Sequence, residues 1–185
     1  ILGCLPAENS RSLNGWWRSN DLGARHDHDI GSGQAAEPGA SRVLVFGESF
    51  TQGSRLPQEE TWIHQMRVAY PLLDAINFGV DGYGMAQSLL RYQSVSDRTH
   101  HDAVVFVFLP TANLWRDINT IRSLAEPWDS FAVLPRYLPV TMGVELIRSP
   151  YSNVAEVFRA NQKGLSSDLR SHLQRYDRFY VRELF

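Results

Sequence analysis

Three short strand-like segments, each followed by a polar turn, place the strongest constraint on the fold of this chain. The segments cover residues 43–46, 74–78 and 103–109, and segments with helical periodicity separate them at residues 58–70 and 85–95. The first and third are continuous apolar runs, which are typical of strands buried on both faces of a sheet. The alternation of strand and helix therefore predicts an α/β fold with a parallel sheet and helices on both sides, a three-layer αβα arrangement.

The size and the charge of the chain limit the classes of function that it can have. Its 185 residues carry 20 acidic and 18 basic side chains, a formal net charge of −2. A nucleic-acid-binding protein usually has a strongly basic total or a basic stripe, so we expect no nucleic-acid partner. The longest apolar run, residues 103–109, is far shorter than the roughly 20 residues of a membrane-spanning helix. A single cysteine, Cys4, excludes a disulfide framework.

Composition divides the chain into three parts. Residues 1–40 are rich in small polar residues and predict an N-terminal arm wrapped over the domain. Residues 41–120 form the N-terminal part of the parallel-sheet domain. Residues 121–185 predict an irregular insertion, broken by prolines, followed by an amphipathic helix of the same domain. We expect that helix to cover its own sheet, and the alternative is a helix that binds a membrane surface or a partner.

Candidate functional residues follow the carboxyl ends of the three expected strands, where ligands of parallel sheets bind. Ser49 follows the first strand, Gly82 lies in a glycine-rich loop after the second, and Asn113 lies in a loop after the third. An acyl-transfer site needs a nucleophile and independent hydrogen-bond donors, because the tetrahedral intermediate places negative charge on one oxygen. Each residue type also has a purely structural interpretation, since Ser, Gly and Asn commonly cap helices or form turns.

Three segments carry a family resemblance: VLVFGESFTQG (residues 43–53), INFGVDGYGMAQ (residues 76–87) and TANLWRD (residues 111–117). They are similar to the three ordered blocks of the SGNH, or GDSL-like, hydrolases. Upstream, SNDLGARHD (residues 19–27) resembles the Asn-x-x-Gly-x-Arg lead-in of the family's bacterial extracytoplasmic branch. The resemblance covers about residues 19–119. It implies a flavodoxin-like sheet with strand order 2-1-3-4-5, of which only the first three strands are found here, so that the fold is incomplete at its C-terminal end.

The resemblance implies a role for each candidate residue. Ser49 would be the nucleophile of a serine esterase or acyltransferase that works through an acyl-enzyme without a cofactor. The amides of Ser49 and Gly82 and the side chain of Asn113 would hold the oxyanion. The substrate would be a small-molecule or polysaccharide ester, and the lead-in segment suggests an acylated carbohydrate. The resemblance also implies an extracytoplasmic location. Glu48 replaces the family's usual Asp, while Ala112 and Leu114 stand where Gly and Asp are more common.

The catalytic base is not identified in this chain. Members of the family carry a late Asp-x-x-His pair, and Asp97 to His100 matches that pattern by letter. However, His100 precedes the third strand whereas Ser49 follows the first, which separates them by roughly 23 Å, against the roughly 3 Å that proton transfer requires. We therefore expect the chain to end before the block that carries the base. His101 is excluded for the same reason, because it also precedes the third strand. His64 and His172 are expected in helices. The remaining candidates for the base are His26 and His28 in the N-terminal arm.

Three other functions are alternatives to the esterase hypothesis. The first is a non-catalytic relative that binds a glycan or a partner through the same cleft. The second is a flavodoxin-like nucleotide binder, although the glycine loop lacks both the Gly-x-Gly-x-x-Gly and the P-loop spacing. The third is a metal site, which the single cysteine and the lack of a His-x-x-x-His pair disfavour. We therefore expect no metal.

Overall fold

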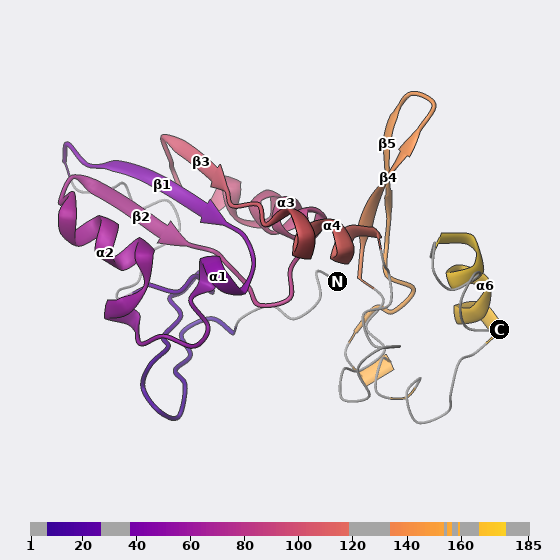
Figure 1. Ribbon diagram of the computed structural model, residues 1–185, viewed down its shortest axis with the longest axis horizontal. Coiled ribbons are helices and arrows are strands. Elements are labelled where there is room, and N and C mark those ends of the chain that lie inside the picture. Colours follow the sequence, from indigo (N-terminus) through magenta and orange to yellow (C-terminus); the bar gives the residue numbers. More distant parts are fainter. Residues whose placement is uncertain are drawn as a thin grey trace. The chain divides into compact units, whose positions relative to one another are not determined.

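The computed structural model describes residues 7–26, 38–118, 134–153, 155–156, 159 and 167–176 (Figure 1). Contacts divide the chain into two compact units. The first, Cys4–Leu109, is called the sheet unit. The second consists of Ile1–Gly3 and Pro110–Phe185 and is called the hairpin unit.

The sheet unit contains a parallel sheet of three strands. In Figure 1, β1 (Ser41–Phe46) lies between β2 (Leu73–Asn77) and β3 (Ala103–Phe106), which gives the order β2-β1-β3. The predicted parallel sheet is thus confirmed. The prediction that the first and third strands are neighbours is confirmed as well. The third strand is shorter than predicted. Backbone pairing continues only to the Val107 amide, which donates to the Phe46 carbonyl at 2.8 Å.

Helices connect the strands as the sequence pattern predicts. Helix α1 (Ser49–Gln52) is a single turn directly after β1, and α3 (Met85–Val95) joins β2 to β3 with the predicted bounds. The helix predicted over residues 58–70 is divided into η1 (Gln58–Glu60) and α2 (Trp62–Ala69). Thr61 separates these two because its hydroxyl caps α2 by accepting the His64 amide. A further turn, η2 (Ser96–Arg98), precedes β3.

Apolar side chains are buried on both faces of the sheet. Residues of alternating position in β1 point to opposite faces, as in any strand. On one face, Leu44, Phe46, Ile76 and Phe78 pack with Val95 of α3 and with Leu22 and Ala24. On the other face, Val45 and Ala75 pack with Ile63 of α2. The core of the sheet unit is therefore built from helices, strands and a segment of the first 40 residues.

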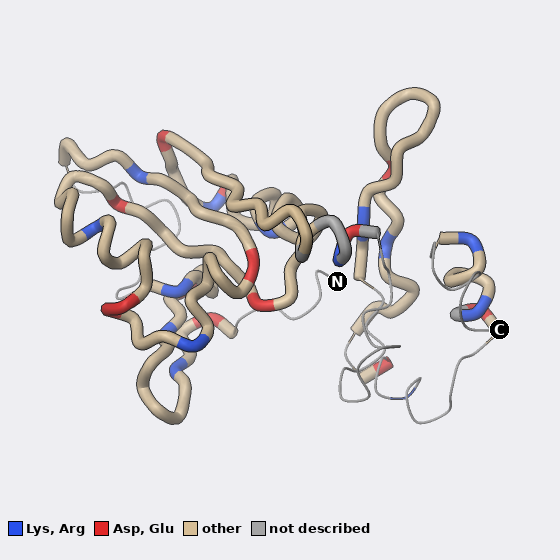
Figure 2. Tube along the Cα trace, viewed as in Figure 1, with Lys and Arg blue, Asp and Glu red and all other residues tan. Residues whose placement is uncertain are grey.

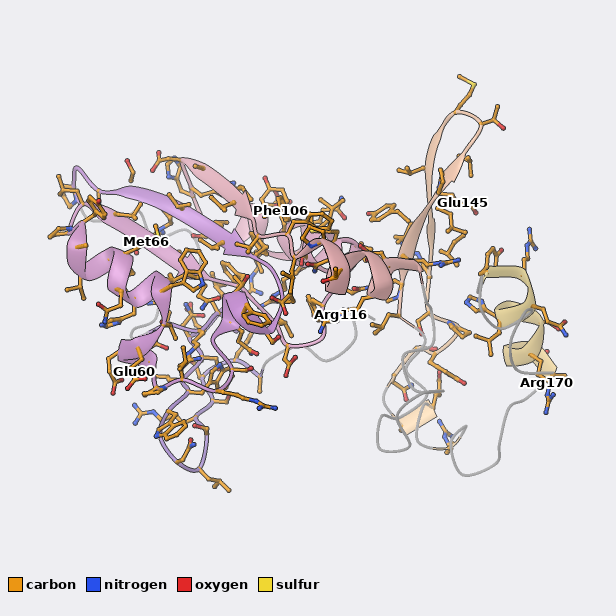
Figure 3. All side chains as sticks on the ribbon, viewed as in Figure 1. Glu60, Met66, Phe106, Arg116, Glu145 and Arg170 are labelled. Atoms are coloured by element: carbon orange, nitrogen blue, oxygen red, sulfur yellow. The ribbon has the colours of Figure 1, made fainter. Side chains whose placement is uncertain are left out.

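A cluster of aromatic side chains packs on the sheet face that carries Phe46. The Phe46 ring stacks on Phe78 with centroids 5.0 Å apart and on Phe106 at 5.5 Å, and Tyr92 of α3 meets Phe46 edge-on. Figure 3 shows Phe106 at the end of β3. Offset and edge-to-face pairs of this kind add to the free energy gained from burial alone. The cluster fixes the carboxyl ends of all three strands, where the candidate loops begin.

Part of the expected arm is an integral piece of this unit. Leu22 and Ala24 are fully buried, and the Arg25 amide donates to the Asn77 carbonyl at 2.8 Å in an isolated antiparallel bridge. Arg25 is therefore paired with the last residue of β2, on the edge that β1 does not occupy. Residues 27–37 lie outside the described part of the chain.

The hairpin unit contains a β-hairpin that was not predicted from the sequence. After α4 (Pro110–Ile118), strands β4 (Arg136–Val140) and β5 (Gly143–Ile147) form an antiparallel hairpin within the region expected to be irregular. The turn consists of two residues, and Gly143 after it has a φ of 103°, a conformation that favours glycine. The predicted terminal helix is present as α6 (Ser167–Tyr176).

Charged residues of both signs are interspersed along the described parts of both units (Figure 2). None of the helices in the described ranges has the length and apolar character required to cross a bilayer.

Polar side chains join the three strands at the amino edge of the sheet. The buried Arg42 guanidinium donates from Nε to Asp74 Oδ2 at 2.7 Å and from Nη1 to Thr99 Oγ1 at 3.3 Å. The Arg42 amide donates to Asp102 Oδ2 at 2.7 Å. His26, only 1% exposed, places Nε2 3.8 Å from Asp74 Oδ1. This arrangement supports the sheet at the edge opposite to the candidate site.

Asp74 makes the stability of the sheet unit sensitive to acid. Its neighbour His26, and to a smaller extent Arg42, lower the pKa of Asp74 from 3.8 to about 2 against the opposing effect of burial. A carboxyl whose pKa falls on folding stabilises the protein above its unfolded pKa, and that contribution is lost as the pH falls through the folded value. We therefore expect wild-type unfolding free energy to fall by about 2 kcal/mol between about pH 5 and pH 2 on account of Asp74. Denaturant unfolding at several pH values measures this loss.

The matched variant is Asp74→Asn, which cannot ionise at this position. It should be less stable than the wild type at pH 7, and the difference between the two proteins should shrink toward pH 2. A stability difference that stays constant over this pH range would contradict the assignment.

Candidate active site

Ser49 is the first residue of α1, directly after the tight turn that follows β1. Glu48 is the N-cap of α1, and its Oε1 accepts the Phe50 amide at 3.0 Å. The Ser49 hydroxyl donates to Glu48 Oε2 at 2.6 Å. Ser49 is half-buried, whereas Glu48 is only 1% exposed. The candidate nucleophile is therefore held at the carboxyl end of the central strand by a buried carboxyl group.

The loop after β2 is bonded directly to this turn. The Val80 amide donates to the Gly47 carbonyl at 3.0 Å, and the Asp81 amide donates to Gln52 Oε1, also at 3.0 Å. At Gly79 the two backbones approach so closely that a Cβ atom would lie 2.5 Å from the Gln52 nitrogen. Figure 1 shows α1 near the ends of β1 and β2. The structure thus brings the Ser49 and Gly82 segments together, as expected from the parallel arrangement of their strands.

Gly82 lies in a backbone turn that suits glycine. Its φ is 82°, and the Tyr83 amide closes the turn by donating to the Val80 carbonyl at 3.2 Å. Gly82 is buried, while the neighbouring Asp81 is exposed. Within the described ranges, the amides of Ser49 and Gly82 donate to no protein acceptor. Neither N–H group is therefore committed to a backbone or side-chain acceptor in the described part of the chain.

Asn77, which the sequence analysis did not single out, holds the two loops in register. Its Nδ2 donates to the Thr51 carbonyl at 2.9 Å, and its Oδ1 accepts the Gly79 amide at 2.9 Å. Asn77 is buried at the end of β2. A polar residue at the end of a predicted strand, two positions before a glycine, was the signal available in the sequence.

Arg25 is a second supporting residue that the sequence analysis did not assign. Its side chain is 2% exposed and donates to the carbonyls of Gln52 and Gly53 at the end of α1. Asn20 shapes the preceding turn, since its Oδ1 accepts the amides of Leu22 and Ala24. The Asn-x-x-Gly-x-Arg pattern was the sequence signal that marked this segment. In the structure, Arg25 of this pattern holds the chain that follows Ser49 in place.

Asn113 is not in the loop that the sequence predicted. Helix α4 begins at Pro110 and includes Asn113, so the predicted loop of residues 110–113 is helical. Proline is favoured in the first turn of a helix, where its missing N–H costs no hydrogen bond. The side chain of Asn113 is buried in the hairpin unit. The structure therefore does not join Asn113 to Ser49 and Gly82 within one unit.

None of the described histidines of the sheet unit is hydrogen-bonded to Ser49. His26 contacts Asp74 at the amino edge of the sheet, and the exposed His100 directly precedes β3 at that same edge, as predicted. His28 lies outside the described residues. Further positions are His64 in α2, His101 beside Tyr92, and His172 in α6 of the hairpin unit. Among the described side chains, the one that accepts the Ser49 hydroxyl is Glu48.

Metal binding finds no support in the described part of the chain. No three His, Cys, Asp or Glu side chains there are placed to share a metal ion.

No model of a known protein family, no curated protein and no solved structure significantly matches this chain.

Proposed function

We propose that this chain carries the nucleophile region of an SGNH-type serine esterase or acyltransferase with a flavodoxin-like, three-layer fold. The observation that supports the proposal is the bonding of the Gly82 loop to the turn that presents Ser49. This juxtaposition places a hydroxyl and two backbone amides without protein acceptors in neighbouring segments of the described chain. An acyl-transfer site requires this combination of groups.

In the proposed reaction, Ser49 Oγ attacks the carbonyl carbon of an ester. The amides of Ser49 and Gly82 stabilise the negative charge that develops on the carbonyl oxygen. Removing one such donor typically costs about 2.7–4 kcal/mol of transition-state stabilisation.

The proposed substrates are small-molecule or polysaccharide esters, with acylated carbohydrate as the favoured class and an extracytoplasmic location. Phe50, beside the candidate nucleophile, is 73% exposed. An exposed aromatic ring at this position offers a rigid apolar surface to an acyl group or a sugar ring. This exposure supports an apolar contact near the reacting carbonyl.

A fluorophosphonate serine probe tests the nucleophile. We expect the full chain to be labelled covalently and Ser49→Ala to lose the label, because the probe reacts with activated serine hydroxyls. The matched control is Ser54→Ala, since Ser54 is an exposed serine only five positions away. Mass spectrometry of the labelled peptide gives the site. Labelling that persists unchanged in Ser49→Ala would refute the assignment.

The second candidate function is a non-catalytic domain that binds a glycan or a partner through the same groups. The observation in its favour is that no described histidine of the sheet unit is hydrogen-bonded to Ser49. A wild-type chain that binds acylated oligosaccharides in calorimetry but takes up no probe would support this second function over the first.

A further inference from the structure

A short hairpin near the N-terminus, residues 10–19, exposes large apolar side chains to solvent. Its two arms pair at Arg11 and Arg18 in an isolated antiparallel bridge. At the end of this hairpin, Leu13 is completely exposed and Trp16 is 49% exposed. Figure 1 shows that the segment of residues 7–26 extends from the sheet unit as a narrow loop. Apolar side chains gathered on such a projecting loop are typical of an interaction surface.

Hydrogen bonds within the hairpin hold its end in one conformation. The Ser12 amide donates to the Trp17 carbonyl at 2.9 Å, and the Gly15 amide donates to the Ser12 carbonyl at 3.0 Å. Asn14 Oδ1 accepts the Ser12 hydroxyl at 2.6 Å and the Trp16 amide at 3.2 Å. The exposed side chains are therefore carried by a closed turn, so little conformational entropy is lost when a partner covers them.

Arg25 joins this hairpin to a second exposed apolar residue. Its Nη2 donates to the Trp16 carbonyl at 2.8 Å and to the Leu56 carbonyl at 2.6 Å. Leu56 is itself 41% exposed. Because one buried guanidinium nitrogen bonds both carbonyls, Trp16 and Leu56 are neighbours in space. The side chains of Leu13, Trp16 and Leu56 are called the apolar tip.

The segments that carry the apolar tip are basic. Residues 10–19 and the connection from α1 to η1, residues 49–57, contain three arginines and no acidic residue, in a chain whose formal net charge is −2. Two of these arginines, Arg11 and Arg55, are exposed, and neither forms an ion pair with a described side chain. Exposed arginines beside apolar side chains complement a surface that is apolar inside and negatively charged outside.

We propose that the apolar tip docks this protein onto the surface of an anionic lipid bilayer. Leu13 and Trp16 enter the interfacial region, where tryptophan is favoured. Arg11 and Arg55 contact the lipid phosphates. Three side chains offer little of the about 800 Å² that each partner covers in a standard protein–protein interface. Membrane binding, in contrast, increases with each buried apolar side chain and each basic residue near the surface.

Sedimentation of the full chain with lipid vesicles tests this inference. We expect the wild type to bind vesicles of phosphatidylcholine that contain about one-third phosphatidylglycerol. Binding to pure phosphatidylcholine should be at least about tenfold weaker, because the arginines then lack an anionic surface. Added salt should weaken binding to the anionic vesicles, since it screens the attraction between exposed charges.

Two variants test the apolar side chains. Leu13→Ser and Trp16→Ala should each weaken binding to the anionic vesicles by at least about tenfold, because each removes apolar surface that the bilayer would bury. The matched control is Leu72→Ser, the same substitution at a leucine that is 67% exposed and directly precedes β2. It should bind as the wild type does. Thermal melting verifies that all three variants are folded.

A third variant tests the charge. Arg11→Gln should weaken binding to the anionic vesicles by about fivefold, which is the contribution of one basic residue near such a surface. Arg148→Gln removes the same charge from an exposed arginine of the hairpin unit and should leave binding unchanged. A loss that is equal in both variants would show that net charge, and not the position of Arg11, governs binding, and would contradict the inference.

The remaining outcomes are equally decisive. Wild-type binding by both Leu13→Ser and Trp16→Ala would overturn the role of the apolar tip, and a folded wild type that binds no vesicles would overturn docking itself. A dimer in analytical ultracentrifugation that Leu13→Ser dissociates, without vesicle binding, would show that the tip joins two copies of this chain instead. Vesicle binding requires no acyl chemistry, so a wild type that binds vesicles but takes up no serine probe would contradict the proposed function and support this inference.

Discussion

Replacing Arg25 by alanine is expected to lower the free energy of unfolding by about 4 kcal/mol or more, a large part of the stability of a typical domain. All five N–H donors of the guanidinium have acceptors in the folded protein. The Nε group donates to Gln58 Oε1 at 2.7 Å, and the two Nη groups donate to four backbone carbonyls. Alanine leaves these acceptors without their donor, and each unsatisfied buried polar group costs about 1–3 kcal/mol. Denaturant unfolding followed by circular dichroism measures the effect.

Two further variants identify the cause of this loss. Arg25→Lys retains the positive charge but offers only three donors, so its stability should lie between the wild type and Arg25→Ala. Arg55→Ala removes an exposed arginine and should change stability by less than about 0.5 kcal/mol. If Arg25→Lys were as stable as the wild type, charge rather than the five-fold hydrogen bonding would explain the role of Arg25.

The parts of the fold that the sequence predicted are those encoded in contiguous residues. The run at residues 43–46 is apolar at every position because β1 is buried on both faces, between α2 on one side and α3 on the other. Helix α3 was predicted with its bounds because Gly84 precedes its apolar periodicity. The parallel order then follows from the right-handed connection of strand, helix and strand.

The parts that the sequence did not predict depend on contacts between distant residues. Arg25 donates hydrogen bonds to acceptors up to 33 positions away in the sequence, and no local sequence pattern predicts such bonds. The β4–β5 hairpin was hidden because Pro139 argues against a strand and Thr141-Met142 is not a common hairpin turn. A two-stranded hairpin tolerates Pro139 because an edge strand does not need every backbone donor.

The same distinction applies to the candidate site. Ser49 and Gly82 were placed correctly relative to their strands, since a residue that follows a parallel strand lies at its carboxyl edge. The contact of Ser49 with Glu48 was not predicted, because it depends on the backbone conformation where the chain leaves β1 and enters α1.

Gly79→Ala is expected to separate the two loops of the candidate site. The added Cβ would lie 2.5 Å from the Gln52 nitrogen and 2.9 Å from the Thr51 carbonyl carbon, both backbone atoms that cannot rotate away. The loop after β2 must then move, which breaks the bond from the Val80 amide to the Gly47 carbonyl. We expect unfolding free energy to fall by about 3 kcal/mol, at the upper end of overpacking effects. Because Gly82 moves away from Ser49, probe labelling should fall at least about tenfold.

Gly39→Ala serves as the comparison for this substitution, because it separates steric contact from backbone strain. Gly39 has a φ of 82° but open space around its Cβ position, so alanine there costs only the strain of about 1–2 kcal/mol and should leave labelling unchanged. Gly79 differs in that its cost arises from backbone atoms of α1. Thermal melting and labelling of both variants therefore measure whether the close approach of the two loops is required. A Gly79→Ala protein with wild-type melting and labelling would show that the site does not depend on that approach.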